Sequence, residues 1–165
     1  MKKITFILML LGPLFLIASN TPCKKLLGKY TKEKKIQKTF SVNSSAELNI
    51  DNKYGDVSIM TYDGNEITFD IIIKTNGNEE EKVIEKLNQI DIEFSGTKDQ
   101  VSAKTIFNTR NTYSWMSWFK PSCKVKMQID YVVNIPITNH IDISNDYGGI
   151  YIDKLKGNAV ISCVI

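Results

Sequence analysis

The sequence contains little of what common catalytic centres are built from. Its 165 residues include a single histidine, His140. Ser-His-Asp and Cys-His arrangements need a histidine as the base, so any such site would depend on this one residue. His140 follows Pro136 in the stretch Thr138-Asn139-His140, which is typical of a turn before a strand. We therefore interpret His140 as a surface histidine and expect no enzymatic activity.

Metal and cofactor signatures are absent as well. The three cysteines show no C-x-x-C spacing, which argues against a zinc site and a thioredoxin-like redox motif. Several aspartates lie near predicted corners, but they fit neither the EF-hand spacing nor the calcium-binding nonapeptide, and no paired-acid motif of a hydrolase is evident. No glycine-rich run precedes a Lys-Ser or Lys-Thr pair, so a phosphate loop is not indicated. We expect neither a metal nor a cofactor. The aspartates are Asp51, Asp56, Asp63, Asp142, Asp146 and Asp153.

Long hydrophobic runs are also missing, except at the N-terminus. Lys2 and Lys3 precede an apolar stretch over residues 4–18 that Gly12 and Pro13 interrupt. A membrane-spanning helix needs roughly 20 apolar residues, so this shorter run favours a signal peptide over an uncleaved anchor. We predict a signal peptide over residues 1–19, cleavage after Ser19, and export to the periplasm, the cell surface or the medium.

Cysteine chemistry adds a second question about the envelope. Acylation of Cys23 would make the chain a lipoprotein and would place it at a membrane, but Pro22 stands where a small residue is needed. The remaining cysteines, Cys123 and Cys163, leave an odd total, so at least one thiol is free or paired between chains. A Cys123–Cys163 bridge and two unpaired thiols both remain open.

Charge is distributed unevenly along the chain. The net charge is +3, yet residues 24–38 hold seven lysines and one acid, Glu33, and the rest of the chain from Thr39 on is acidic. A basic leader of this kind attracts anionic lipid or nucleic acid, but the acidic body disfavours nucleic acid. We interpret residues 20–38 as a solvated lysine-rich linker and residues 39–165 as a single β-repeat domain.

Period-two alternation dominates the remaining sequence and predicts half-buried strands. One helix is predicted near residues 79–88, with Asn78 and Glu81 forming a capping box. Glycine at a turn, as at Gly55, is expected to supply a positive φ. Strands are predicted around residues 40–50, 57–61, 67–75, 90–94, 101–105 and 125–133. The fold class is therefore mainly β, a repetitive β-solenoid or β-sandwich-like domain with one short helix.

A repeat at an offset of 93 residues is the most informative feature. Residues 48–59 align with residues 141–152, and Asn52, Tyr54 and Gly55 recur as Asn145, Tyr147 and Gly148. Each unit is a strand, a corner and a strand, and it must bury its apolar face against another unit. The corner is explained by turn chemistry, with the tyrosine packing over the turn.

The repeat also predicts a further strand from Val160, and the sequence stops inside it at Ile165. Such an ending leaves an open apolar strand edge. We expect a longer protein in which further coils of the same kind follow.

These motifs carry a family resemblance. The sequence resembles a family of exported bacterial proteins called putative adhesins, which are similar to the heads of auto-transporter adhesins. The resemblance lies in the lead-in Phe-Ser-Val, the stretch Leu48–Ile59, the Glu-rich helix before Ile90, and the stretch Ile129–Pro136 with a second Asn-x-Tyr-Gly corner after it. The resemblance covers residues 38–165. It implies a repetitive β-structure, often a β-helix, and brings no catalytic residues with it.

One segment has the composition of a contact loop. Aromatic side chains crowd into residues 108–122 beside basic ones, and such loops stack on sugars or anchor protein partners. The alternative is that the loop folds back and plugs the β-core. The candidate contact residues are Arg110, Tyr113, Trp115, Trp118 and Phe119.

Together these features predict a non-catalytic, exported, adhesin-like domain that contacts a protein or glycan at the cell envelope. The alternative is a structural β-module of the envelope that pairs with another chain through its open edge. Nucleic acid is not expected as a partner, and a membrane is expected only if Cys23 is lipidated.

Overall fold

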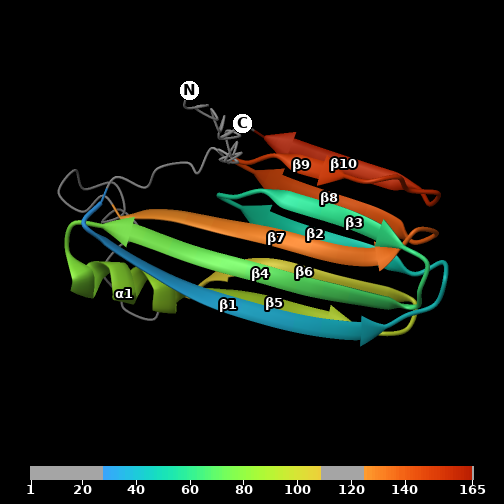
Figure 1. Cartoon of the computed structure of the whole chain (residues 1–165), viewed down its shortest axis with the longest axis horizontal. Coiled ribbons are helices and arrows are strands. Elements are labelled where there is room, and N and C mark those ends of the chain that lie inside the picture. The colour runs from blue at the N-terminus through green and yellow to red at the C-terminus, as the bar shows by residue number, and fades with distance from the viewer. Residues whose placement is uncertain (1–27, 109–124, 165) are drawn as a thin grey trace, which may run out of the picture.

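Two five-stranded sheets make up the protein in the computed structural model, which describes residues 28–108 and 125–164. Sheet 1 has the strand order β1-β4-β7-β3-β9, and sheet 2 has the order β10-β8-β2-β6-β5 (Figure 1). Both sheets mix parallel and antiparallel pairs. The prediction of a mainly β chain with one short helix is confirmed, and the solenoid remains a prediction. The strands are β1 (Tyr30–Ser41), β2 (Glu47–Lys53), β3 (Val57–Tyr62), β4 (Glu66–Gly77), β5 (Ile90–Gly96), β6 (Gln100–Phe107), β7 (Lys126–Pro136), β8 (His140–Asp146), β9 (Ile150–Ile152) and β10 (Ala159–Val164), and the helix is α1 (Glu80–Gln89).

The lysine-rich segment, predicted to be a linker up to residue 38, is instead a strand from Tyr30 onward. β1 pairs antiparallel with β4 along its whole length. Two of its lysines find acidic partners, because Lys32 Nζ lies 2.6 Å from Glu80 Oε1 and Lys34 Nζ lies 3.0 Å from Asp91 Oδ1. Charge density alone suggested a solvated segment, whereas the alternation of Lys34, Ile36 and Phe40 on one face allows a sheet edge.

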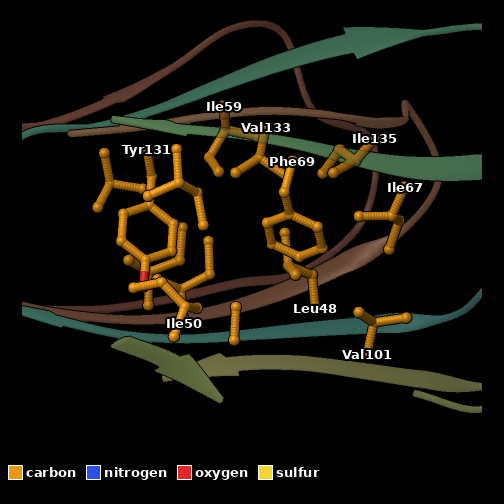
Figure 2. Packing of buried hydrophobic residues seen from close by; sticks show 14 of the residues in the cluster. Leu48, Ile50, Ile59, Ile67, Phe69, Val101, Tyr131, Val133 and Ile135 are labelled. Atoms are coloured by element: carbon orange, nitrogen blue, oxygen red, sulfur yellow. The ribbon is translucent and has the colours of Figure 1, made fainter. Parts of the chain in front are cut away.

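The core lies between the two sheets and follows from the alternation of side chains. In Figure 2, Phe69 and Val133 project from sheet 1 toward Leu48 and Ile50 of sheet 2. Tyr131, Phe69, Leu48 and their neighbours are almost completely excluded from solvent. Because β2, β4, β7 and β8 each place every second residue inward, one continuous apolar layer forms.

The helix α1 connects β4 to β5 and lies against β4 and β1 (Figure 1). Its N-cap is Glu79, without a side-chain cap hydrogen bond. The predicted capping box at Asn78 and Glu81 is therefore wrong, because Asn78 Oδ1 instead accepts a hydrogen bond from the Lys29 amide at 3.2 Å. Within the described ranges, no helix has the length and apolarity needed to cross a membrane.

The two copies of the repeat lie side by side in register. Leu48 of β2 pairs with Ile141 of β8, and Val57 of β3 pairs with Ile150 of β9, so both strands of one unit run parallel to their counterparts in the other. β10 then pairs parallel with β8, with Cys163 opposite Asn145. Equivalent residues of the two repeat units, 93 positions apart in the sequence, are thus paired directly in the sheets.

Candidate functional site

The repeated Asn-x-Tyr-Gly corner places two asparagine side chains inside the protein. Asn52 and Asn145 are both fully buried. Asn52 Nδ2 donates to Asn145 Oδ1 at 3.0 Å and to the Ile129 carbonyl at 3.1 Å, and Asn145 Nδ2 donates to the Gly55 carbonyl at 2.9 Å. Buried amides of this kind are stable only when their hydrogen bonds are made. The two corners are therefore joined by a ladder of amide groups.

The tyrosines of the corners, and not the glycines, adopt the left-handed backbone. Tyr54 has φ 66° and Tyr147 has φ 62°, and no described glycine has a positive φ. The prediction for Gly55 is wrong in this respect. Glycine is needed there for space, since a Cβ on Gly55 would lie 2.0 Å from the Ile129 carbonyl oxygen, and one on Gly148 would lie 1.8 Å from the Gly55 carbonyl oxygen.

An aromatic row follows the corners along the surface. The rings of Tyr54 and Tyr147 are stacked, with centroids 5.2 Å apart and planes inclined by 8°. Phe107 meets Tyr54 edge-on at 6.2 Å, and Lys86 Nζ lies 5.9 Å from the centre of the Phe107 ring. Burial lowers the pKa of Lys86 to about 8. Tyr54 and Phe107 are half-buried in this row, whereas Tyr147 is largely exposed.

A polar network connects the asparagine ladder to the core. Thr105 Oγ1 donates to Asn52 Oδ1 at 2.9 Å and lies 2.9 Å from the Tyr131 hydroxyl. Tyr131 is fully buried, and this burial raises the pKa of its phenol. Because the members of the network satisfy one another away from solvent, we interpret it as structural.

The candidate acid–base and metal residues lie apart from one another. His140 is half-buried at the start of β8, where its Nδ1 accepts a hydrogen bond from the Asn158 amide at 2.9 Å. Corner aspartates pair locally, as Asp51 does with Lys104 at 2.8 Å and Asp146 with Lys53 at 3.2 Å. No group of three potential metal ligands occurs in the part of the chain that the structure describes.

The outer face of sheet 1 carries an exposed apolar patch that pattern analysis missed. Its residues come from three neighbouring strands, because Tyr151 of β9 pairs with Ser58 of β3, and Ser58 pairs with Val132 of β7. Met60 follows on the same face of β3. Met60 is 53% exposed, Tyr151 61% and Val132 38%. We call Met60, Tyr62, Val132 and Tyr151 the outer patch.

Tyr62 closes one end of the outer patch. Its hydroxyl donates to the Glu66 carbonyl at 2.9 Å and accepts from the Glu66 amide at 3.2 Å, so the ring lies across the β3–β4 turn at Gly64. The sequence did contain a signal for this surface, since Met60, Tyr62 and Tyr151 occupy polar positions of the alternating pattern. Large apolar residues at such positions indicate a surface used for contact.

The predicted contact residues Arg110, Tyr113, Trp115, Trp118 and Phe119 lie outside the described residues. The described chain on either side of them reaches the α1 end of the sheets, where the Asn108 amide donates to the Gln89 carbonyl at 2.7 Å. Of the cysteines, Cys163 is described, and it is exposed and free.

Comparison with known proteins gave two similar solved structures. One is a putative cell adhesion protein from Clostridium sporogenes, with 13% sequence identity and a TM-score of 0.48, where the match covers 80% of this chain and 57% of that one. The other is a putative adhesin from Bacteroides fragilis, with 16% identity and a TM-score of 0.35, covering 79% and 55%. This chain thus spans about half the length of either structure. No family model and no curated protein matches the sequence.

Proposed function

We propose that this chain is a non-catalytic, exported, adhesin-like module that binds a protein or glycan of the cell envelope through the outer patch. The observation that carries the proposal is the exposure of Met60, Val132 and Tyr151 on three adjacent strands of one sheet face. Large apolar and aromatic side chains that share a rigid face are typical of contact surfaces.

The surroundings of the outer patch fit such a role. Ser58 lies between Tyr151 and Val132 in the pairing register, so a small hydroxyl separates two larger side chains. Asn134, beside Met60 in the register, donates its side-chain amide to Thr68 Oγ1 at 3.0 Å. Apolar and aromatic groups with polar neighbours suit a sugar face or a protein partner, which both present apolar and hydrogen-bonding atoms together.

Export and repeat architecture belong to the same proposal. A signal peptide over residues 1–19 would deliver the module to the envelope, where a contact surface is of use. The in-register stacking of β2 on β8 and of β3 on β9 supports a β-solenoid type of growth, in which each added coil buries the apolar face of the previous one. The aromatic segment with Trp115 and Trp118 would add a second contact region.

Binding to isolated envelope fractions and to immobilised glycans tests the proposal. The exported chain should be retained, and the double variant Met60→Lys/Tyr151→Ala should bind about tenfold more weakly, because it places a charge and a gap in the contact. Ile84→Lys is the matched control, since Ile84 is 40% exposed on α1, away from sheet 1's outer patch. Failure of the unmodified chain to bind any fraction, or an equal loss in the control, would refute the role of this surface.

A further inference from the structure

Both tyrosines of the outer patch lie against a glycine. A Cβ on Gly149 would lie 2.8 Å from Cε2 of Tyr151, and one on Gly64 would lie 2.1 Å from Cε2 of Tyr62. Each ring therefore occupies the space that a side chain would need there, so it lies along the surface instead of projecting from it. The sides of the two rings that are turned away from the glycines face solvent, since Tyr151 is largely exposed and Tyr62 partly so.

The positions of these rings are set by the sheet itself. Tyr62 is held at both ends, by β3 and by the two hydrogen bonds of its hydroxyl to Glu66, so it offers a ring side and no unused hydroxyl. A ring held in this way loses little conformational freedom when a ligand binds. Tyr151 belongs to the outward-facing set of β9, so a strand added beside β9 would lie next to this ring and not over it.

The two rings are too far apart for one small ligand. Tyr151 stands in register with Ser58, which precedes Tyr62 by four residues on β3. A strand rises about 3.3 Å per residue, so about 13 Å of sheet lies between the two positions. The rings lean away from each other, toward Gly149 and Gly64. A ligand that contacts both rings must therefore be an extended chain of several units.

Polar groups without a protein partner lie between the rings. Within the described ranges, Ser58 Oγ and Asn134 Oδ1 take part in no hydrogen bond, and Asn134 uses its amide nitrogen to donate to Thr68. Met60 lies beside Asn134 in the pairing register, and Val132 lies beside Ser58. Hydroxyl-binding and apolar groups thus lie side by side, as a sugar ring requires, because it presents C–H groups at its centre and hydroxyls at its rim.

The charges around the outer patch select against an acidic ligand. The outer patch itself contains no charged residue. Asp70 of β4 stands opposite Val132 in the register, and Asp130 lies two positions before Val132 on the same face of β7. An anionic chain along this face would lie near both carboxylates and be repelled by them. An uncharged chain meets no such cost.

We propose that the outer patch binds a linear, uncharged glycan, with one sugar unit on Tyr151, another on Tyr62, and hydroxyls of the units between them bonded to Ser58 and Asn134. This inference rests on the proposed function and names its ligand. The negative faces of aromatic rings attract the C–H groups of sugars without a charge on either partner. An extended chain reaches both rings along a sheet face, whereas the anchoring side chains of a protein partner usually enter pockets.

Binding to neutral oligosaccharides of increasing length tests the proposal. The probes are β-linked glucose and N-acetylglucosamine chains from the monosaccharide to the hexasaccharide, titrated into the exported full chain in a calorimeter. Affinity should rise about tenfold or more between chains that reach one ring and chains that reach both, because the second contact is then intramolecular. Tyr151→Ala should abolish this rise, and Tyr151→Phe, which keeps the ring, should retain it. Tyr30→Ala, on the opposite edge strand β1, is the control and should bind like the parent chain.

Protease treatment of the envelope fractions separates this proposal from the proposed function. Retention of the chain should survive the digestion and should be competed by the neutral hexasaccharides. Retention that is lost after protease and resists the hexasaccharides would assign the outer patch to a protein partner, which overturns the glycan and leaves the contact role intact. Failure of every neutral chain to bind, tighter binding of an acidic chain such as polygalacturonate, or a rise with length that Tyr151→Ala retains would also overturn the glycan.

Discussion

Replacement of Asn52 by alanine tests whether the asparagine ladder holds the two repeat units together. Asn52 donates to the Asn145 side chain and to the Ile129 carbonyl and accepts from Thr105. Thr105 keeps the Tyr131 hydroxyl as a partner after the substitution. Two buried acceptors, Asn145 Oδ1 and the Ile129 carbonyl, lose the donor that Asn52 supplied.

The expected loss of stability follows from these two acceptors. A buried polar group left without its partner costs about 1–3 kcal/mol, so Asn52→Ala should lower the free energy of unfolding by about 2–6 kcal/mol. Small domains have about 5–15 kcal/mol in total, so the effect is a large share of the stability. Urea denaturation should show a lower midpoint with an unchanged slope.

Asn49→Ala on the same strand is the control, because Asn49 is only half-buried and lies on the outer face of β2. It should change the free energy of unfolding by about 0.5 kcal/mol or less. If Asn52→Ala cost no more than this control, the buried ladder would not be what joins the repeats.

Asn52→Asp extends the test to pH. The carboxylate would face the two acceptors without a donor, so burial should raise its folded pKa above the unfolded value. A group whose pKa is raised on folding makes its full contribution to the stability of the folded state below the unfolded pKa. It loses that contribution as the pH rises through the folded pKa. The variant should therefore be most stable in acid relative to the parent chain, and a pH-independent difference would contradict this reasoning.

Three further predictions concern the corners and α1. Tyr54→Gly should be more stable than Tyr54→Ala by about 1 kcal/mol in thermal unfolding, because the φ of 66° strains every residue except glycine. This reverses the usual order, in which alanine is the more stabilising of the two residues. If the alanine variant were the more stable one, this strain would be absent. Gly148→Ala should destabilise by about 1–3 kcal/mol or more, since its Cβ would meet the Gly55 carbonyl, whereas Gly149→Ala should be mild because its Cβ would meet only the Tyr151 side chain, which can move. Burial lowers the pKa of Lys86 to about 8, so the unfolded state binds more protons between that pH and the ordinary lysine value, and stability should rise with pH across this range. Lys86→Met should abolish this rise in denaturant titrations at several pH values, and an unchanged rise would assign it to another group.

Strand positions and the repeat were predictable from the sequence because alternation reports directly on which residues are buried. Inward positions such as Leu48, Ile50, Ile129 and Tyr131 are buried as the pattern indicates. The structure then places equivalent residues of the two units side by side, where Asn52 Nδ2 donates to Asn145 Oδ1.

Three features could not be predicted from the alternation of apolar and polar residues, because each depends on contacts between distant parts of the chain. The strand β1 has too many lysines to be recognised as a strand, and two of them have acidic partners, Glu80 and Asp91, that lie far away in the sequence. Tyr54 combines a positive φ with ring stacking on Tyr147, a contact that local turn chemistry does not contain. The outer patch depends on which strands become neighbours, and this is a property of the topology rather than of any one segment.

The position of β2 in sheet 2 has a consequence for how the chain reaches its native state. Its neighbours on both sides, β6 and β8, come from later in the chain, and the same holds for β3 between β7 and β9. In an ordinary linear array each repeat contacts only its neighbours in the sequence, so folding can begin at any repeat and spread from there. Here β2 has no neighbouring strand until β6 has been synthesised, β3 has none until β7, and the second unit comes later still. The contacts that define the fold are therefore long-range, and folding should be slow and all-or-none. A nascent chain that ends before β7 lacks any partner strand for β3, so this part of it should remain unfolded.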